Sequence, residues 1–155
     1  MHPSETLDWK AVLAEIDASA YTGPLPSIPC WIGDSESSEL LNQLILDGAK
    51  TATATLLWDY EFENETLPIV GEVQALLGWS NQLLGLIETS AIDIIPFQEV
   101  SAEYAALEGE GDLSLDYWRR VHMEVFTTVC RTIGKTASQD MPVVCEEFRL
   151  VCRFG

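Results

Sequence analysis

The sequence predicts an α+β fold in which helices flank a curved or closed β-sheet. Strand-like and helix-like segments are both present, but they do not alternate regularly, as a parallel sheet with crossover helices would require. The 155 residues fit one domain, and 47% of them are hydrophobic, which is enough to bury a core without disulfides or metals. We therefore expect a single sheet with separate helices packed around it.

The first thirty residues are expected to form a helical extension packed on that domain. Residues 1–18 carry apolar side chains at helical spacing, with Ser4 as a candidate cap, and a connector rich in proline and glycine follows. We accordingly divide the chain into an N-terminal extension with its connector, residues 1–30, and a domain, residues 31–155. An apolar face on the extension is also compatible with a homodimer.

The domain is expected to begin with a helix over about 36–47. Asp34 is its candidate N-terminal cap, and Gly48 suits the left-handed residue that ends a helix. A later long helix has a cap candidate at Ser114 and a glycine stop at Gly134. The remaining elements are expected, in chain order, as strands at 72–78, 83–89 and 91–97, helices at 101–108 and 114–132, and a last strand at 143–154.

The charge of the chain restricts its partners. The formal net charge is −17, with only eight lysine and arginine residues, so the surface should repel phosphate on average. This argues against binding to duplex nucleic acid and leaves room for a small positive pocket that reads one nucleotide or a small substrate. No apolar run is long enough to cross a membrane and no signal-peptide pattern is present, so we expect a cytoplasmic location.

The composition also limits the chemistry. Four cysteines are scattered without a C-x-x-C pair, and only two histidines are present, so a zinc site or a histidine-based nucleophilic triad is poorly supplied. We expect neither a metal nor another cofactor. Any reaction must therefore use lysine, threonine, tyrosine and carboxylates.

The most informative segment follows Gly48, where the period changes from helical to two. Thr51, Thr53 and Thr55 then face one way, while Lys50 lies at the junction and can reach over either face. A lysine beside threonines can bind an anion or help turn a hydroxyl into a nucleophile. It can equally satisfy the last carbonyls of the preceding helix, and the spacing alone leaves both interpretations open.

A second unusual segment is the acidic turn Glu108-Gly109-Glu110-Gly111-Asp112. Its acids can simply favour the N-terminus of the helix that follows. Alternatively, Glu108 or Glu110 faces Lys50, and one of the crowded carboxylates holds a proton and acts as a general acid.

Other side chains have weaker signals. Glu146 lies on an apolar face of the last strand, and we expect a structural salt bridge to Arg119, Arg120 or Lys50. Trp58 and Tyr60 could stack on a base, although aromatic residues at such positions are more often core. His122 is expected to be a hydrogen-bonded core residue. Arg119 could clamp a phosphate or carboxylate, or pair with the acidic turn.

In succession, these segments resemble the ASCH domain family, whose fold is similar to the PUA β-barrel. The resemblance runs from about residue 31 to the C-terminus. The matching pieces, in order, are Gly33-Asp34, Gly48-x-Lys50-Thr51-x-Thr53, Leu57-Trp58-x-Tyr60-Glu61, Pro68 to Gly71, Ile87-Glu88-Thr89, Glu108 to Asp112, Tyr117-Trp118-Arg119 and Met141 to Glu146.

This resemblance implies a cleft connected with RNA or modified nucleosides. The family includes small amidohydrolases that remove the acetyl group of acetylcytidine with a Lys-x-x-Thr pair and a glutamate. By that match Lys50 would be the base, Thr53 the nucleophile, and Glu110 or Glu108 the acid. Other relatives are ribonucleases of single-stranded RNA, and a binding module without chemistry is a further alternative.

The remaining residues of the cleft would bind the substrate, and the chain departs from the amidohydrolase pattern at one place. The binding residues would be Thr51, Thr55, Trp58, Tyr60 and Arg119. Ala54-Thr55 stands where the small enzymes tend to carry an arginine after the threonine, which leaves the reaction itself open.

Overall fold

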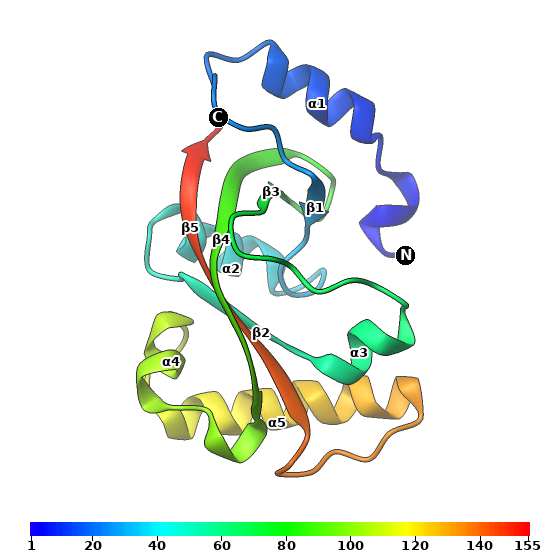
Figure 1. The fold of residues 1–155 in the computed structure, drawn as a ribbon, viewed down its shortest axis with the longest axis vertical. Helices are drawn as coiled ribbons and strands as arrows, with labels where there is room; N and C mark the ends of the chain where they lie inside the picture. Colours follow the sequence, from blue (N-terminus) through cyan, green and yellow to red (C-terminus); the bar gives the residue numbers. More distant parts are fainter.

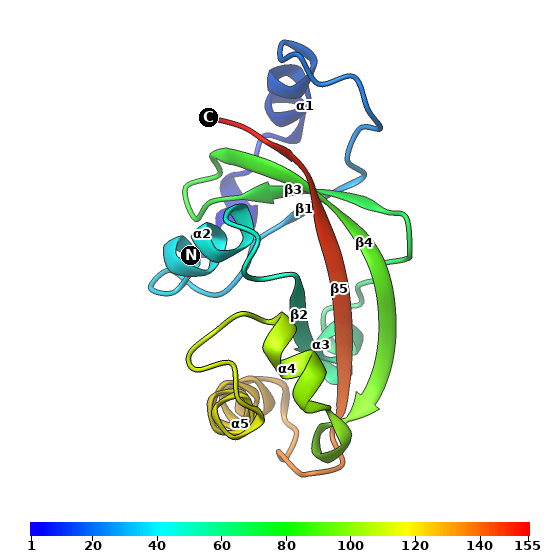
Figure 2. The same cartoon turned by 90° about the vertical axis from the view of Figure 1, so that its left-hand side faces the viewer.

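The computed structural model describes all 155 residues as one curved, five-stranded sheet with helices on both faces (Figures 1 and 2). The strands lie in the order β1-β3-β4-β5-β2, and only the β1–β3 pair is parallel. Their bounds are β1 Ile28–Cys30, β2 Ala52–Leu56, β3 Val73–Leu77, β4 Leu83–Pro96 and β5 Pro142–Arg153. The sheet is open, with β1 and β2 at its edges, so it is curved rather than closed.

The helices gather at the two ends of the long β4–β5 pair (Figure 1). The N-terminal α1 lies at one end, and α4 and α5 lie at the other, with α2 and α3 between them. Their bounds are α1 Trp9–Asp17, α2 Ser38–Leu46, α3 Leu57–Phe62, α4 Ala102–Leu107 and α5 Leu115–Ile133, with 3₁₀ turns at Pro3–Thr6 and Phe97–Glu99. None of the helices combines the length and the apolar composition needed to span a lipid bilayer.

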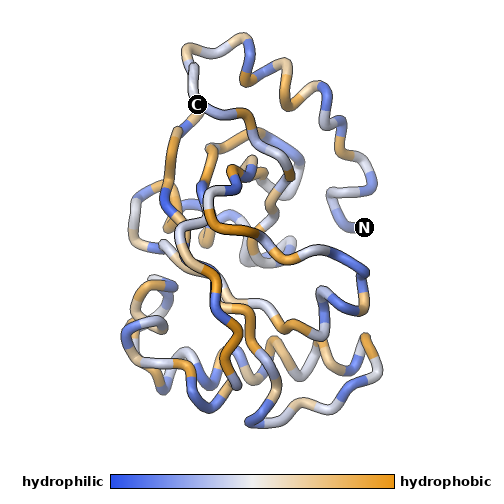
Figure 3. The backbone as a smooth tube through the Cα atoms, in the orientation of Figure 1, coloured by the Kyte–Doolittle hydropathy of each residue, from blue (hydrophilic) through white to orange (hydrophobic).

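Three apolar clusters form the core, because the twisted β4–β5 pair offers different faces to different helices. One cluster joins α1 to β3 and β4 through residues such as Ile16 and Leu86. A second lies on the opposite face of β3 and β4, under α2, around Ile45 and Ile87. The third joins β2 and β5 to α4 and α5 around Trp118. Hydrophobic stretches recur along the central strands, interrupted by hydrophilic positions (Figure 3).

Several local predictions are confirmed. The Ser114 hydroxyl accepts a hydrogen bond from the Tyr117 amide at the start of α5, and Gly134 ends that helix in the left-handed conformation (φ 75°). Gly48 also has a left-handed backbone (φ 82°) after α2. These features depend only on neighbouring residues, so the sequence determines them well.

Other local predictions are wrong. Asp34 does not cap α2; its carboxylate accepts from the amides of Glu36 and Ser37 in the preceding turn. The strands expected at 83–89 and 91–97 are one strand, β4, in which a register shift between Thr89 and Ala91 absorbs the change of pattern. The N-terminal helix starts only at Trp9, since the Asp8 side chain caps it there and a separate 3₁₀ turn precedes it.

Candidate active site

Lys50 is a buried cation held between two carboxylates. Its amide donates to the Leu44 carbonyl of α2 at 3.0 Å, which ties the backbone to the end of that helix. The side chain points elsewhere: Nζ lies 3.0 Å from Glu108 Oε1 and 2.8 Å from Glu110 Oε2. Lys50 is only 2% exposed. The Lys50 side chain therefore does not bind the carbonyls of α2, and its partner is the acidic turn.

The acidic turn is docked directly on the backbone beside Lys50. Gly109 has φ 71°, and a Cβ atom there would lie 2.2 Å from the Ala49 carbonyl oxygen. The Thr51 amide donates to the Leu107 carbonyl at 2.8 Å, which fixes the same two segments together. A glycine is thus required at position 109, both for the backbone conformation and for the close approach.

Glu108 is the inner of the two carboxylates and has three donors. Oε1 accepts from Lys50, while Oε2 accepts from the Trp118 indole N–H and lies 3.2 Å from His122 Nε2. Burial alone would raise the pKa of Glu108, but the His122 hydrogen bond and the Lys50 charge outweigh it and lower that pKa to about 2. Glu110 is the outer carboxylate, with 20% of its side chain exposed.

His122 completes the cluster from α5. Its ring stacks on Trp118 at 4.2 Å between centroids, and Nδ1 lies 2.8 Å from the Trp118 carbonyl oxygen. Both ring nitrogens thus face oxygen atoms, one of the Trp118 carbonyl and one of the Glu108 carboxylate. His122 is half-buried and hydrogen-bonded, as the sequence predicted, but its contact with Glu108 was missed. The signal was present, since Trp118 and His122 share a helix face just after the acidic turn.

The Thr53 side chain lies on the sheet face that points away from α4 and α5. In the antiparallel β2–β5 pair it is directly opposite Glu146, so the two side chains share a face. Ala52 and Leu56, on the other face of β2, belong to the cluster under α4 and α5. The Lys50 ammonium bonds only to the acidic turn, and the structure shows no hydrogen bond between Lys50 and the Thr53 hydroxyl.

The family model of the ASCH domain matches residues 29–152. This chain belongs to the ASCH domain family. The fold agrees with a crystal structure of an ASCH domain from Lactobacillus crispatus, at 27% identity and a TM-score of 0.82, over 93% of this chain and 94% of that one. A protein from Enterococcus faecalis is 31% identical with a TM-score of 0.76, over 94% of this chain and 86% of its own. No curated protein matches the chain.

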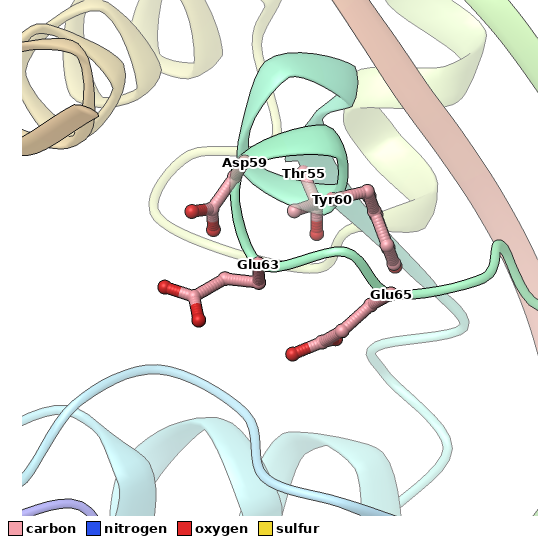
Figure 4. A pocket seen from close by; sticks show the side chains of 5 residues that line it. All are labelled: Thr55, Asp59, Tyr60, Glu63 and Glu65. Atoms are coloured by element: carbon pink, nitrogen blue, oxygen red, sulfur yellow. The ribbon is translucent and has the colours of Figure 1, made fainter. Parts of the chain in front are cut away.

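In this ASCH domain, Thr55 and Tyr60 line a cavity of about 110 Å³ (Figure 4). Three acids, Asp59, Glu63 and Glu65, complete its wall. Burial and then the charge of Glu146 raise the pKa of the Tyr60 hydroxyl, which stays protonated and can donate. The cavity is therefore polar and acidic, which suits a small ligand with donor groups more than a phosphate chain.

Three further residues predicted to bind substrate lie apart from this cavity. Trp58 packs against the cluster under α4 and α5, with the Lys135 ammonium 5.5 Å from its ring centre. Arg119 is exposed, and its guanidinium donates to the Gln98 carbonyl at 3.3 Å without forming an ion pair. Thr51 contacts the turn, since its hydroxyl lies 3.4 Å from the Leu107 carbonyl. Binding roles for these residues remain predictions.

Glu146 is buried in the ASCH domain but is not in a salt bridge, so that prediction is wrong. Its Oε2 accepts from Gln74 Nε2 and from Thr89 Oγ1, each at 2.8 Å. Arg119, Arg120 and Lys50 all bond elsewhere or lie at the surface, because the register of β5 turns Glu146 toward β3 and β4. Burial raises the pKa of Glu146. The acids of the chain form no group suited to hold a metal ion.

Proposed function

We propose that this ASCH domain hydrolyses an amide bond on an acetylated nucleoside such as acetylcytidine. One observation carries the proposal: the buried Lys50 ammonium is paired with two carboxylates at the start of the strand that bears Thr53. Burying a lysine costs free energy even when it is paired, so such a buried cluster favours a catalytic role.

The Lys50–Glu110 pair supplies both proton-transfer groups. A proton moves from Lys50 Nζ to Glu110 Oε2, two atoms 2.8 Å apart, which leaves a neutral amine and a neutral carboxylic acid. The amine takes the proton of Thr53 Oγ1 as that oxygen attacks the acetyl carbon. The acid then gives its proton to the leaving nitrogen as the amide bond breaks.

A second half-reaction restores the protein. Water attacks the acetyl ester on Thr53, and Glu110, now a carboxylate, takes a proton from that water. The ester bond breaks, acetic acid leaves and loses its proton to the solvent, and Thr53 Oγ1 recovers its proton from Lys50. Glu110 then passes its proton back to Lys50, so the ion pair is regenerated.

The mechanism requires the Lys50 side chain to leave the acidic turn and to reach around the edge strand β2 to the opposite sheet face when substrate binds. Thr53 is three residues away, which is roughly 10 Å of extended chain. Glu108 would lose one donor in that movement but would keep Trp118 and His122. A buried carboxylate that retains two donors is not left uncompensated, so the departure of the ammonium is feasible.

The test is hydrolysis of acetylcytidine by the purified chain and by Lys50→Ala, Thr53→Ala and Glu110→Gln. We expect each variant to lose at least about a hundredfold in kcat, because each removes a reacting group. Glu103→Gln, an exposed acid on neighbouring α4, is the matched control and should keep full activity. Full activity in folded Lys50→Ala or Thr53→Ala would contradict the mechanism.

Single-stranded RNA is the second candidate substrate, which the family resemblance suggests. The acids around the cavity and the net charge of −17 count against a polyanion at this place. A parallel incubation with a short single-stranded RNA, with and without a chelator, separates the two. RNA cleavage that is lost in Lys50→Ala would assign the same cluster to phosphodiester chemistry.

A further inference from the structure

Four neighbouring strands present a connected row of polar side chains on one face of the sheet. Gln74 on β3, Thr89 on β4, Glu146 on β5 and Thr53 on β2 follow the strand order. Gln74 Nε2 donates to both Thr89 Oγ1 (3.0 Å) and Glu146 Oε2 (2.8 Å), and Thr89 donates to the same Oε2 (2.8 Å). All the donors in this network point at a single oxygen of Glu146.

The other oxygen of Glu146 has no partner in the protein. Glu146 is only 5% exposed, yet Oε1 accepts no hydrogen bond. It also differs from Asn42 Oδ1, the one unpaired side-chain atom that is sealed from solvent. Glu146 Oε1 is thus a buried acceptor that solvent can still reach. Because solvent reaches this oxygen, either water or an N–H group of a ligand can donate to it.

The surroundings of Glu146 identify the cleft to which this oxygen belongs. Burial and then the charge of Glu146 raise the pKa of Cys30 on β1, to about 12, and that of Tyr60 on α3. Both groups therefore lie near the carboxylate and stay protonated. Thr53 is its direct neighbour across the β2–β5 pair. The row of polar side chains thus lies near Tyr60, which lines the cavity shown in Figure 4, and that cavity is the candidate cleft for a ligand of Glu146.

We propose that Glu146 Oε1 reads the nucleobase by accepting a hydrogen bond from an exocyclic N–H, so that the cleft selects cytosine-type over uracil-type bases. This deepens the proposed function and rests on it for the identity of the ligand as a nucleoside. Uracil has a carbonyl oxygen where cytosine has the amino group, and two acceptors facing each other repel.

This contact also places the amide for attack. In acetylcytidine the acetyl carbon is bonded to the exocyclic nitrogen whose N–H would meet Glu146. Side chains directly opposite each other in an antiparallel pair have Cβ atoms about 5 Å apart. An N–H on Glu146 therefore sets the acetyl carbon beside Thr53, the nucleophile of the proposed reaction.

The decisive variant is Glu146→Gln, because the fixed donors dictate how the new amide must turn. Gln74 and Thr89 both donate, so the amide oxygen takes the Oε2 position and the NH₂ group points into the cleft. The substitution converts the free acceptor into a donor with little change of shape. Glu147→Gln is the matched control, since the adjacent residue of β5 points to the opposite face.

The measurement is an NMR titration of the three labelled proteins with cytidine and with uridine. Wild type and Glu147→Gln should bind cytidine at least about tenfold more tightly than uridine, and Glu146→Gln should prefer uridine. Cytidine dimethylated on its exocyclic nitrogen has no N–H there, and wild type should bind it at least about tenfold more weakly than cytidine. This last comparison needs no variant, so equal binding of the dimethylated nucleoside would overturn the inference even if Glu146→Gln does not fold.

Retained cytidine preference in folded Glu146→Gln, equal binding of the dimethylated nucleoside, or no saturable binding of cytidine by wild type would each overturn the inference. Because these probes carry no acetyl group, the result is independent of turnover. Acetylcytidine hydrolysis with an unchanged preference in Glu146→Gln would leave the proposed function standing and this inference wrong. A reversed preference in a chain without hydrolysis would support base recognition and reject the reaction.

Discussion

Two buried glutamates of this ASCH domain show opposite electrostatics. Glu108 and Glu146 are 2% and 5% exposed, yet the pKa of the first is lowered to about 2 and that of the second is raised. Glu108 accepts from Lys50, Trp118 and His122, whereas Glu146 accepts only from the neutral groups of Gln74 and Thr89. The donors beside a buried carboxylate, and the Lys50 charge in particular, therefore decide whether its pKa falls or rises.

The largest expected effect on stability comes from removing the Lys50 ammonium that Glu108 and Glu110 share. Lys50→Met should lower the free energy of unfolding by about 3 to 5 kcal/mol at neutral pH, because two carboxylates lose their shared ammonium. Urea denaturation measures it, with the exposed Lys10→Met as the matched control. A loss no larger than that of the control would mean that the cluster does not need the cation.

A direct comparison of the two acids should give unequal effects. Glu108→Gln should cost about 3 kcal/mol, since it removes the charge that Lys50 and His122 stabilise. Glu146→Gln should cost less than about 1 kcal/mol, because the amide oxygen still accepts from Gln74 and Thr89. Urea midpoints of both variants, beside Glu103→Gln, test this. Equal losses would show that burial alone sets the energetics.

The pH dependence of stability should differ in sign between the two sites. The lowered pKa of Glu108 contributes stability above its unfolded value near 4.5, and this is lost as the pH falls toward about 2. The raised pKa of Glu146 has the opposite effect: its contribution to stability is present below the unfolded pKa and is lost as the pH rises through the folded pKa. Denaturation curves across acidic pH should therefore show a smaller acid-side loss in Glu108→Gln. In Glu146→Gln, the loss of stability as the pH rises above the unfolded pKa of a glutamate should be smaller. Unchanged curves would contradict both assignments.

Alanine substitutions at two glycines should distinguish the cost of a positive φ from the cost of moving the acidic turn away from the Lys50 segment. Gly109 and Gly134 have similar positive φ values, 71° and 75°, but only at Gly109 would a Cβ meet another backbone atom. Gly134→Ala should cost about 1 kcal/mol, and Gly109→Ala about 2 kcal/mol more, because the turn must move off the Lys50 segment. Thermal unfolding gives both values. Equal costs would mean that the close approach is relaxed easily.

Much of the fold could be predicted from the sequence because it rests on local chemistry. The Ser114 cap, the Gly134 stop and the period change after Gly48 involve residues at most a few positions apart. The contact of Glu108 or Glu110 with Lys50 could also be proposed from the sequence, since few cations compete for those acids. The catalytic roles of Lys50, Thr53 and Glu110 remain predictions.

The sequence by itself determined the family, most of the elements and the set of polar groups available for chemistry. Only the tertiary structure decided which glutamate lies inside, that Trp118 and His122 bind it, and that Glu146 meets Gln74 and Thr89 instead of an arginine. These contacts join residues 10 to 72 positions apart. They depend on strand register and on the shift between Thr89 and Ala91, where one residue more or less turns a side chain to the other face.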